Sequence, residues 1–191
     1  FTGIWIEREA NWSWNKHPVI KLDFARIPHV TPDELTANLN HELLQIAATY
    51  QDAPLTSNHP AITLQILTKI MIARTGKKVV FLIDEYDKPI IDMLKNPAIA
   101  HANRDVLRSF YDTVKSISDQ FQFLFITGIT KFSKTSIFSG LNNLNDITFD
   151  PIAADLCGYT DNEITLSLQN NVQECADALG TTIEVIREDM R

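Results

Sequence analysis

The 191-residue sequence has little glycine and little cysteine, and it has no long apolar run. Its six glycines offer few flexible linkers, which are commonly glycine-rich. Two cysteines, Cys157 and Cys175, lie outside any CxxC or zinc-ligand spacing, which predicts reduced thiols rather than a disulfide scaffold. No stretch approaches the ~18 apolar residues of a membrane-spanning helix. Because the first residues also lack a signal-peptide pattern, we expect a cytoplasmic protein without a membrane partner.

Positive charge is also scarce relative to negative charge. Seventeen Lys and Arg against 24 Asp and Glu give a net charge of −7. Nucleic-acid binding needs clustered Lys and Arg, so the composition does not support a nucleic-acid partner. An apolar fraction of 45% is enough for the core of a globular domain and argues against disorder.

Short apolar runs alternate with longer helical patterns, which predicts an α/β fold with a mainly parallel sheet. The run VVFLI is apolar throughout and the run FQFLFI is apolar on both faces, which predicts strands buried on both faces. The predicted strands are 18–24, 78–83 and 121–127, with an extended piece at 146–149. The predicted helices are 31–50, 60–75, 88–95, 103–118, 160–180 and 183–191. Capping boxes are expected at Thr31–Glu34 and Thr160–Glu163.

Two carboxylates, Asp84 and Glu85, follow directly after a buried strand. Ligand crevices of parallel sheets lie beyond the carboxyl ends of the strands. There Asp84 could hold Mg²⁺ through oxygen, and Glu85 could deprotonate a water that attacks a γ-phosphate. This is the Walker B pattern. The alternative is that both side chains accept hydrogen bonds from loop amides, and we expect Asp87 to cap the following helix.

Thr127 ends the neighbouring apolar strand, just before Gly128. Its hydroxyl could donate to a phosphate oxygen and so sense the γ-phosphate. The alternative is an ordinary threonine at the end of a strand. Lys131 and Lys134 follow and could add positive charge near a phosphate, although solvated side chains explain them as well.

Several motifs of nucleotide and metal sites are missing. A phosphate-binding loop needs GxxxxGK[ST], and the one Gly-Lys pair, Gly76-Lys77, is followed by Lys78 and leads from a helix into a strand. GxGxxG and HExxH are absent, and the five histidines have no ligand spacing. The 191 residues therefore contain no phosphate loop of their own.

Three stretches nevertheless resemble the bacterial predicted AAA-ATPase family: VVFLIDEYDKPIID (79–92), FLFITGITKFSKTSIFSGLNNLNDIT (123–148) and LCGYTDNEI (156–164). FTGIWIE and HPVIKLDF near the start are similar to that family too. Its members often carry a C-terminal nuclease-like domain of the PD-(D/E)xK type, which would be a partner in the same polypeptide. In the family a phosphate loop lies upstream of the segment matching FTGIWIE, so we expect the parent protein to carry that segment.

The resemblance implies a three-layer αβα P-loop NTPase core of the additional-strand type, incomplete because the phosphate-loop strand is absent. Residues 1–155 would be the partial core, and residues 156–191 the start of a truncated helical extension. The intact parent would bind and hydrolyse ATP with Mg²⁺, and the isolated chain would be inactive. Asp84 would be the magnesium acid, Glu85 the catalytic base and Thr127 the sensor, with no arginine finger assigned.

Two other functions stay open. One is a non-catalytic, STAND-like switch or interaction module in which nucleotide occupancy sets a conformation. The other is a metal-dependent nuclease or phosphoesterase with Asp84, Glu85 and Asp87 as ligands. The nuclease would need Lys88 on a strand, whereas Pro89 and the helical pattern after it place that lysine off the strand.

Overall fold

The computed structural model describes residues 14–50, 54–130, 144–153, 156, 160, 162–163, 166 and 168–189. The chain divides into two compact units, residues 1–142 and 143–191, and each is described by itself. The predicted domain boundary between residues 155 and 156 stays a prediction. In the described part of the chain, no helix is both long and apolar enough to cross a membrane.

The first unit is built on a three-stranded parallel sheet. Its strands are β1 (Val19–Asp23), β2 (Val79–Asp84) and β3 (Phe121–Ile126), in the spatial order β1-β2-β3. Both strand pairs are parallel, so all three strands end at the same edge of the sheet. The predicted α/β class and the three predicted strands are confirmed.

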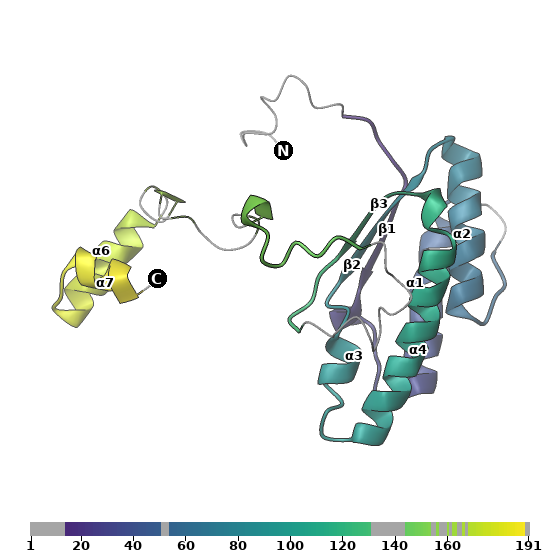
Figure 1. Cartoon of the computed structure of the whole chain (residues 1–191), viewed down its shortest axis with the longest axis horizontal. Helices are drawn as coiled ribbons and strands as arrows, with labels where there is room; N and C mark the ends of the chain where they lie inside the picture. The colour runs from purple at the N-terminus through teal and green to yellow at the C-terminus, as the bar shows by residue number, and fades with distance from the viewer. Residues whose placement is uncertain are drawn as a thin grey trace. The chain divides into compact units, whose positions relative to one another are not determined.

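Helices flank the sheet, and three of them share one of its sides. The helices are α1 (Pro32–Ala48), α2 (Pro60–Thr75), α3 (Lys88–Ile91) and α4 (Pro97–Ser116), with short 3-10 helices η2 (Phe24–Arg26) and η3 (Ser118–Gln120). α1, α2 and α4 contact one another and lie on one side of the sheet (Figure 1). Since the strands follow one another in one direction, crossovers of one hand bring their helices to the same face.

The ends of α1 and α2 follow the sequence signals closely. Thr31 caps α1 by accepting a hydrogen bond from the Glu34 amide at 3.1 Å. Glu34 reaches back to the amide of Val30 at 3.0 Å, rather than to the expected amide of Thr31. α2 ends at Gly76, which has the left-handed φ of 66° that glycine adopts without steric cost.

One face of the sheet is buried and the other is only partly covered. Ile20, Phe81 and Ile83 are buried toward the helices. On the opposite face, Val19 is 43% exposed and Phe123 is 54% exposed. The predicted burial on both faces is therefore wrong for β3, whereas the second face of β2 is half-buried.

Three predicted element boundaries also differ from the structure. α4 begins at Pro97 rather than at residue 103, since proline fits the first helical position. α3 ends at Ile91, short of the predicted residue 95. Residues 146–149 form no strand and end in a turn, in which the Asp150 amide donates to the Ile147 carbonyl at 3.1 Å.

The second unit contains a small helical pair. Its elements are η4 (Pro151–Ala153), α6 (Gln169–Leu179) and α7 (Ile183–Asp189). The capping box at Thr160 and Glu163 is confirmed, with reciprocal hydrogen bonds of 2.8 and 3.2 Å. The helix that ends at Gly180 begins at Gln169, not at this box. The core of the second unit consists of Val172, Ala176 and Ile186, with Leu168 and Ile183 packed against them.

Candidate functional site

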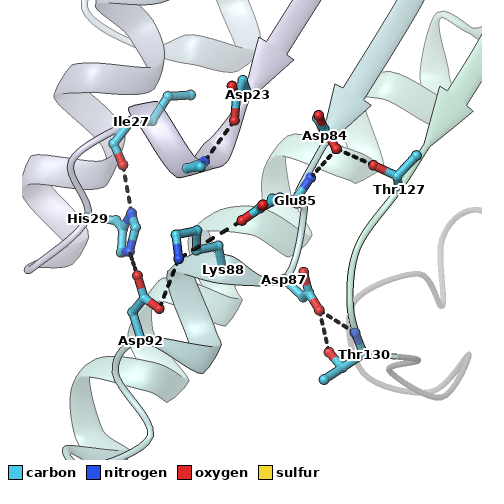
Figure 2. Close-up of polar contacts among 11 residues, drawn as sticks. Asp23, Ile27, His29, Asp84, Glu85, Asp87, Lys88, Asp92, Thr127 and Thr130 are labelled. Carbon is cyan, nitrogen blue, oxygen red and sulfur yellow. Dashed lines mark hydrogen bonds and ion pairs between the residues drawn. The ribbon is translucent and has the colours of Figure 1, made fainter. Parts of the chain in front are cut away.

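Polar side chains gather where the parallel strands end. Asp23 and Asp84 are register partners at the ends of β1 and β2. Thr127 directly follows Ile126, the partner of Ile83, and so lies level with Asp84. The backbone confirms this position, because the Thr127 amide donates to the Ile83 carbonyl at 2.9 Å. Figure 2 shows these side chains at one edge of the sheet.

Asp84 and Thr127 are in direct contact. The Thr127 hydroxyl donates a hydrogen bond to Asp84 Oδ1, and the Glu85 amide donates to the same oxygen at 3.1 Å. Asp84 is exposed, and within the described residues both hydrogen bonds to its carboxylate use Oδ1. Oδ2 is therefore available to a ligand. The side chain of Asp23 is engaged locally, where it accepts a hydrogen bond from the Ala25 amide at 3.1 Å.

Glu85 has a backbone conformation that a residue with a side chain seldom adopts. Its φ of 49° lies in the left-handed region, and it is the one non-glycine residue with positive φ in the described part of the chain. Such conformations cost free energy and occur preferentially at functional sites. The carboxylate reaches toward Lys88, with 4.0 Å between Oε2 and Nζ (Figure 2).

Lys88 also belongs to a row of polar and charged groups that leads away from Glu85. Its Nζ lies 3.4 Å from Asp92 Oδ1, and Asp92 Oδ2 lies 3.1 Å from Nε2 of the buried His29. The Nδ1 atom of His29 contacts the Ile27 carbonyl at 2.6 Å. Lys88, Glu85 and Asp92 are each about a third exposed, so solvent screens these pairs and their contribution to stability is small.

Asp87 does not cap α3, so that prediction is wrong. Its side chain makes no capping hydrogen bond and is completely buried. Oδ2 instead accepts hydrogen bonds from the amide of Thr130 at 2.5 Å and from its hydroxyl at 2.6 Å. The adjacent Tyr86 hydroxyl donates to the Thr130 carbonyl, also at 2.6 Å. The sequence analysis missed this group, since Thr130 lies 43 residues from Asp87.

Behind Asp87 lies a buried phenol. Burial raises the pKa of Tyr111 well above its ordinary value of 10.0, and the electrostatic effects of Tyr86 and Asp87 raise it further. Tyr111 therefore stays neutral beside the Asp87 carboxylate at any physiological pH.

Asn103 connects two segments around the site. Its Nδ2 donates to the His29 carbonyl at 2.8 Å and to the Pro89 carbonyl at 2.9 Å. Asn103 lies on α4 and is completely buried. It thereby ties α4 both to the chain after β1 and to the start of α3.

The donor set at this edge fits a hard divalent cation bound through one carboxylate. Asp84 supplies a carboxylate oxygen and Thr127 a hydroxyl oxygen, and Mg²⁺ commonly binds through one or two carboxylates while keeping several waters. Among the described residues, no three His, Cys, Asp or Glu side chains are placed to share a metal ion. Lys131 and Lys134 lie outside the described residues.

The arrangement does not favour the nuclease alternative. Asp87 faces Thr130 and is buried, instead of turning toward Asp84 and Glu85. Lys88 lies on α3 and not on a strand, as the sequence predicted.

The family described as "Predicted AAA-ATPase" matches residues 1–138. An uncharacterized protein in the vnfD 5' region of Azotobacter chroococcum mcd 1 is 37% identical over 164 residues, covering 86% of this chain and 31% of that protein. The chain thus spans just under a third of that curated relative. No solved structure matches the 191-residue chain.

Proposed function

We propose that this chain, which belongs to the predicted AAA-ATPase family, forms the acidic and sensing half of an ATP-hydrolysis site in the full-length protein. The observation that carries the proposal is the contact between Asp84 and Thr127. These residues lie 43 positions apart in the sequence and meet at the carboxyl edge of a parallel sheet, where ligands of such folds bind.

Asp84 would hold Mg²⁺, directly or through bound waters. Its exposed carboxylate has Oδ2 available, and it is the last residue of β2. A bound magnesium ion would neutralise the charge that develops on the β- and γ-phosphates during transfer. Thr127 would turn its hydroxyl from Asp84 to a phosphate oxygen and so report an occupied site.

Glu85 would act as the general base for the attacking water. It directly follows the magnesium acid and lies in the turn beyond the strand. Its left-handed backbone conformation is strained, and a strained residue beside an exposed acid supports a functional role. A positioned carboxylate that accepts a proton in the transition state contributes about 10²- to 10⁴-fold to a rate.

The phosphate-binding part of such a site must come from elsewhere in the protein. The sequence has no GxxxxGK[ST] loop, whose backbone amides and lysine bind the phosphates. We therefore expect the 191-residue chain alone to bind ATP only weakly in isothermal titration calorimetry. Micromolar binding by this chain would contradict the proposed division of the site.

Glu85→Gln in the full-length protein tests the proposal. This change removes the base and preserves the size of the side chain, so ATP turnover should disappear while ATP binding stays within about twofold. Glu42→Gln, at an exposed position on α1, makes the same chemical change away from the site and should leave turnover unchanged. Unchanged turnover in Glu85→Gln would reject the assigned role.

The contact between Glu85 and Lys88 favours a second candidate, the nucleotide-dependent switch. A carboxylate paired with a cation, here 4.0 Å away, is a weaker base than an unpaired one. A switch would retain bound nucleotide for many minutes with little turnover, and Glu85→Gln would change neither property. Measuring nucleotide release together with turnover separates the two candidates.

Two further expectations concern the whole protein. The C-terminal nuclease-like domain implied by the resemblance and the cytoplasmic location both stay predictions.

A further inference from the structure

The loop that follows β3 is held by the segment that follows β2. Thr130 is bound at three points: its amide and hydroxyl donate to Asp87 Oδ2, and its carbonyl accepts from the Tyr86 hydroxyl. We call Tyr86, Asp87 and Thr130 the Thr130 clamp. Both hydroxyl hydrogen bonds are 2.6 Å long, in the short range expected for O–H···O hydrogen bonds.

Close packing at Gly128 tightens the same loop. A Cβ atom there would lie 2.6 Å from two carbons of the Tyr86 ring and 2.7 Å from Asp87 Oδ1. The backbone of this loop therefore lies directly against both clamp residues, closer than any other amino acid would allow.

The clamp lies immediately beyond Thr127. The Thr127 carbonyl accepts a hydrogen bond from the Tyr86 amide at 3.1 Å, and its own amide is bound to Ile83. Thr127 is thus fixed on both sides, by the sheet before it and by the clamp after it. Because Tyr86 and Asp87 also follow Glu85 directly, displacing the Thr130 loop would move the acidic segment as well.

We propose that the Thr130 clamp positions Thr127 and Glu85 for hydrolysis. Its members are positioning residues, which act through Thr127 and Glu85 without touching the nucleotide, and the inference rests on the proposed function. Burying a carboxylate costs free energy that two hydrogen bonds offset only partly, so Asp87 is a poor choice for stability alone. A buried acceptor with fixed partners does set the path of a loop accurately.

The test compares Thr130→Val, Thr130→Ser and Tyr86→Phe in the full-length protein. Thr130→Val removes the hydroxyl donor and preserves the β-branched shape, whereas Thr130→Ser retains the hydroxyl. Tyr86→Phe removes the hydrogen bond to the Thr130 carbonyl and leaves the ring against Gly128. The matched control is Thr68→Val, since the buried Thr68 hydroxyl donates to the Leu64 carbonyl at 2.7 Å within α2, away from the site.

Thr130→Val and Tyr86→Phe should each lower kcat about tenfold and leave the Kd for ATP within about twofold, because small misplacement of catalytic groups affects the transition state most. Thr130→Ser should restore at least half of the wild-type kcat. Amide hydrogen exchange over residues 127–130 should become faster in both impaired variants. Thr68→Val should lower thermal stability without this kcat effect.

Two outcomes would overturn the clamp and are distinguishable from failure of the proposed function. If Glu85→Gln abolishes turnover but Thr130→Val and Tyr86→Phe retain the wild-type kcat, the clamp is wrong and the hydrolysis site stands. If Thr68→Val loses kcat as much as Thr130→Val, the effect is one of general stability and the clamp is also wrong. If Glu85→Gln retains full turnover, the proposed function itself fails, and the clamp fails with it.

Discussion

Gly128→Ala would place a methyl group where the loop after β3 lies against Tyr86 and Asp87. The nearest ring carbons would be 2.6 Å from the new Cβ, whereas ordinary contacts begin at 3.4 Å. If the ring retreats by about 0.8 Å, the 2.6 Å hydrogen bond to Thr130 stretches to about 3.4 Å, beyond the usual range of an O–H···O hydrogen bond. Overpacking costs about 1–3 kcal/mol and the weakened hydrogen bond about 0.5–1.5 kcal/mol, so we expect a total loss of about 2–4 kcal/mol.

Thermal unfolding of the full-length protein measures this loss. For a domain of this size each kcal/mol lowers Tm by about 2–4 °C, so the Tm of the first unit should fall by about 5–15 °C. Gly76→Ala is the matched control. Gly76 has a φ of 66° and open space around a Cβ, so its substitution tests backbone strain without a clash and should cost about 1 kcal/mol. Gly128 is not among the glycines with positive φ, so its substitution tests the clash alone.

The clash also predicts coupling between two positions. Tyr86→Ala removes both ring carbons, so adding Gly128→Ala in that background should cost at least about 1 kcal/mol less than in the wild type. Additive effects, or a Gly128→Ala protein that melts no lower than the Gly76→Ala control, would refute the reasoning.

The remaining predictions concern the support around the site. Asn103→Leu should cost about 2–4 kcal/mol in thermal unfolding, since two carbonyls lose their buried donor, and wild-type stability would contradict this. Burial raises the pKa of Tyr111, so the folded state keeps a proton that the unfolded state releases, and the free energy of unfolding should fall as pH rises above about 10. Tyr111→Phe should flatten that fall in urea titrations at about pH 9 and pH 11, and an equally steep fall would disprove its origin. Thr31→Ala should cost about 1 kcal/mol by removing the cap of α1, a loss that Thr31→Ser should largely restore.

Local signals predicted most of the elements of the first unit. The strand ends at Asp84 and before Thr127 follow from where the apolar runs stop, and their approach follows from parallel neighbouring strands. The end of α2 at Gly76 follows from that residue alone, because glycine tolerates a positive φ. These features depend on a few consecutive residues and could therefore be predicted from the sequence.

Features that depend on residues far away in the sequence could not be predicted from it. Whether other elements cover Val19 and Phe123 depends on the side of the sheet on which the helices pack. The sequence of an apolar strand does not determine that side. Asp87 directly precedes a helix that begins with Lys and Pro, a position that favours a capping role. Its hydrogen-bond partner is instead Thr130, in another loop. Gly128 was the one available signal, because a glycine directly after a strand can mark a close approach of the backbone as well as a turn.

The order of the strands affects how the newly made chain folds. Val19 pairs with Val80, 61 residues later, so nascent β1 has no partner until β2 has been synthesised. At translation rates of about 5–20 residues per second, that wait lasts about 3–12 s. α1 and α2 are both made within this interval and can associate first, which shields one side of the waiting strand.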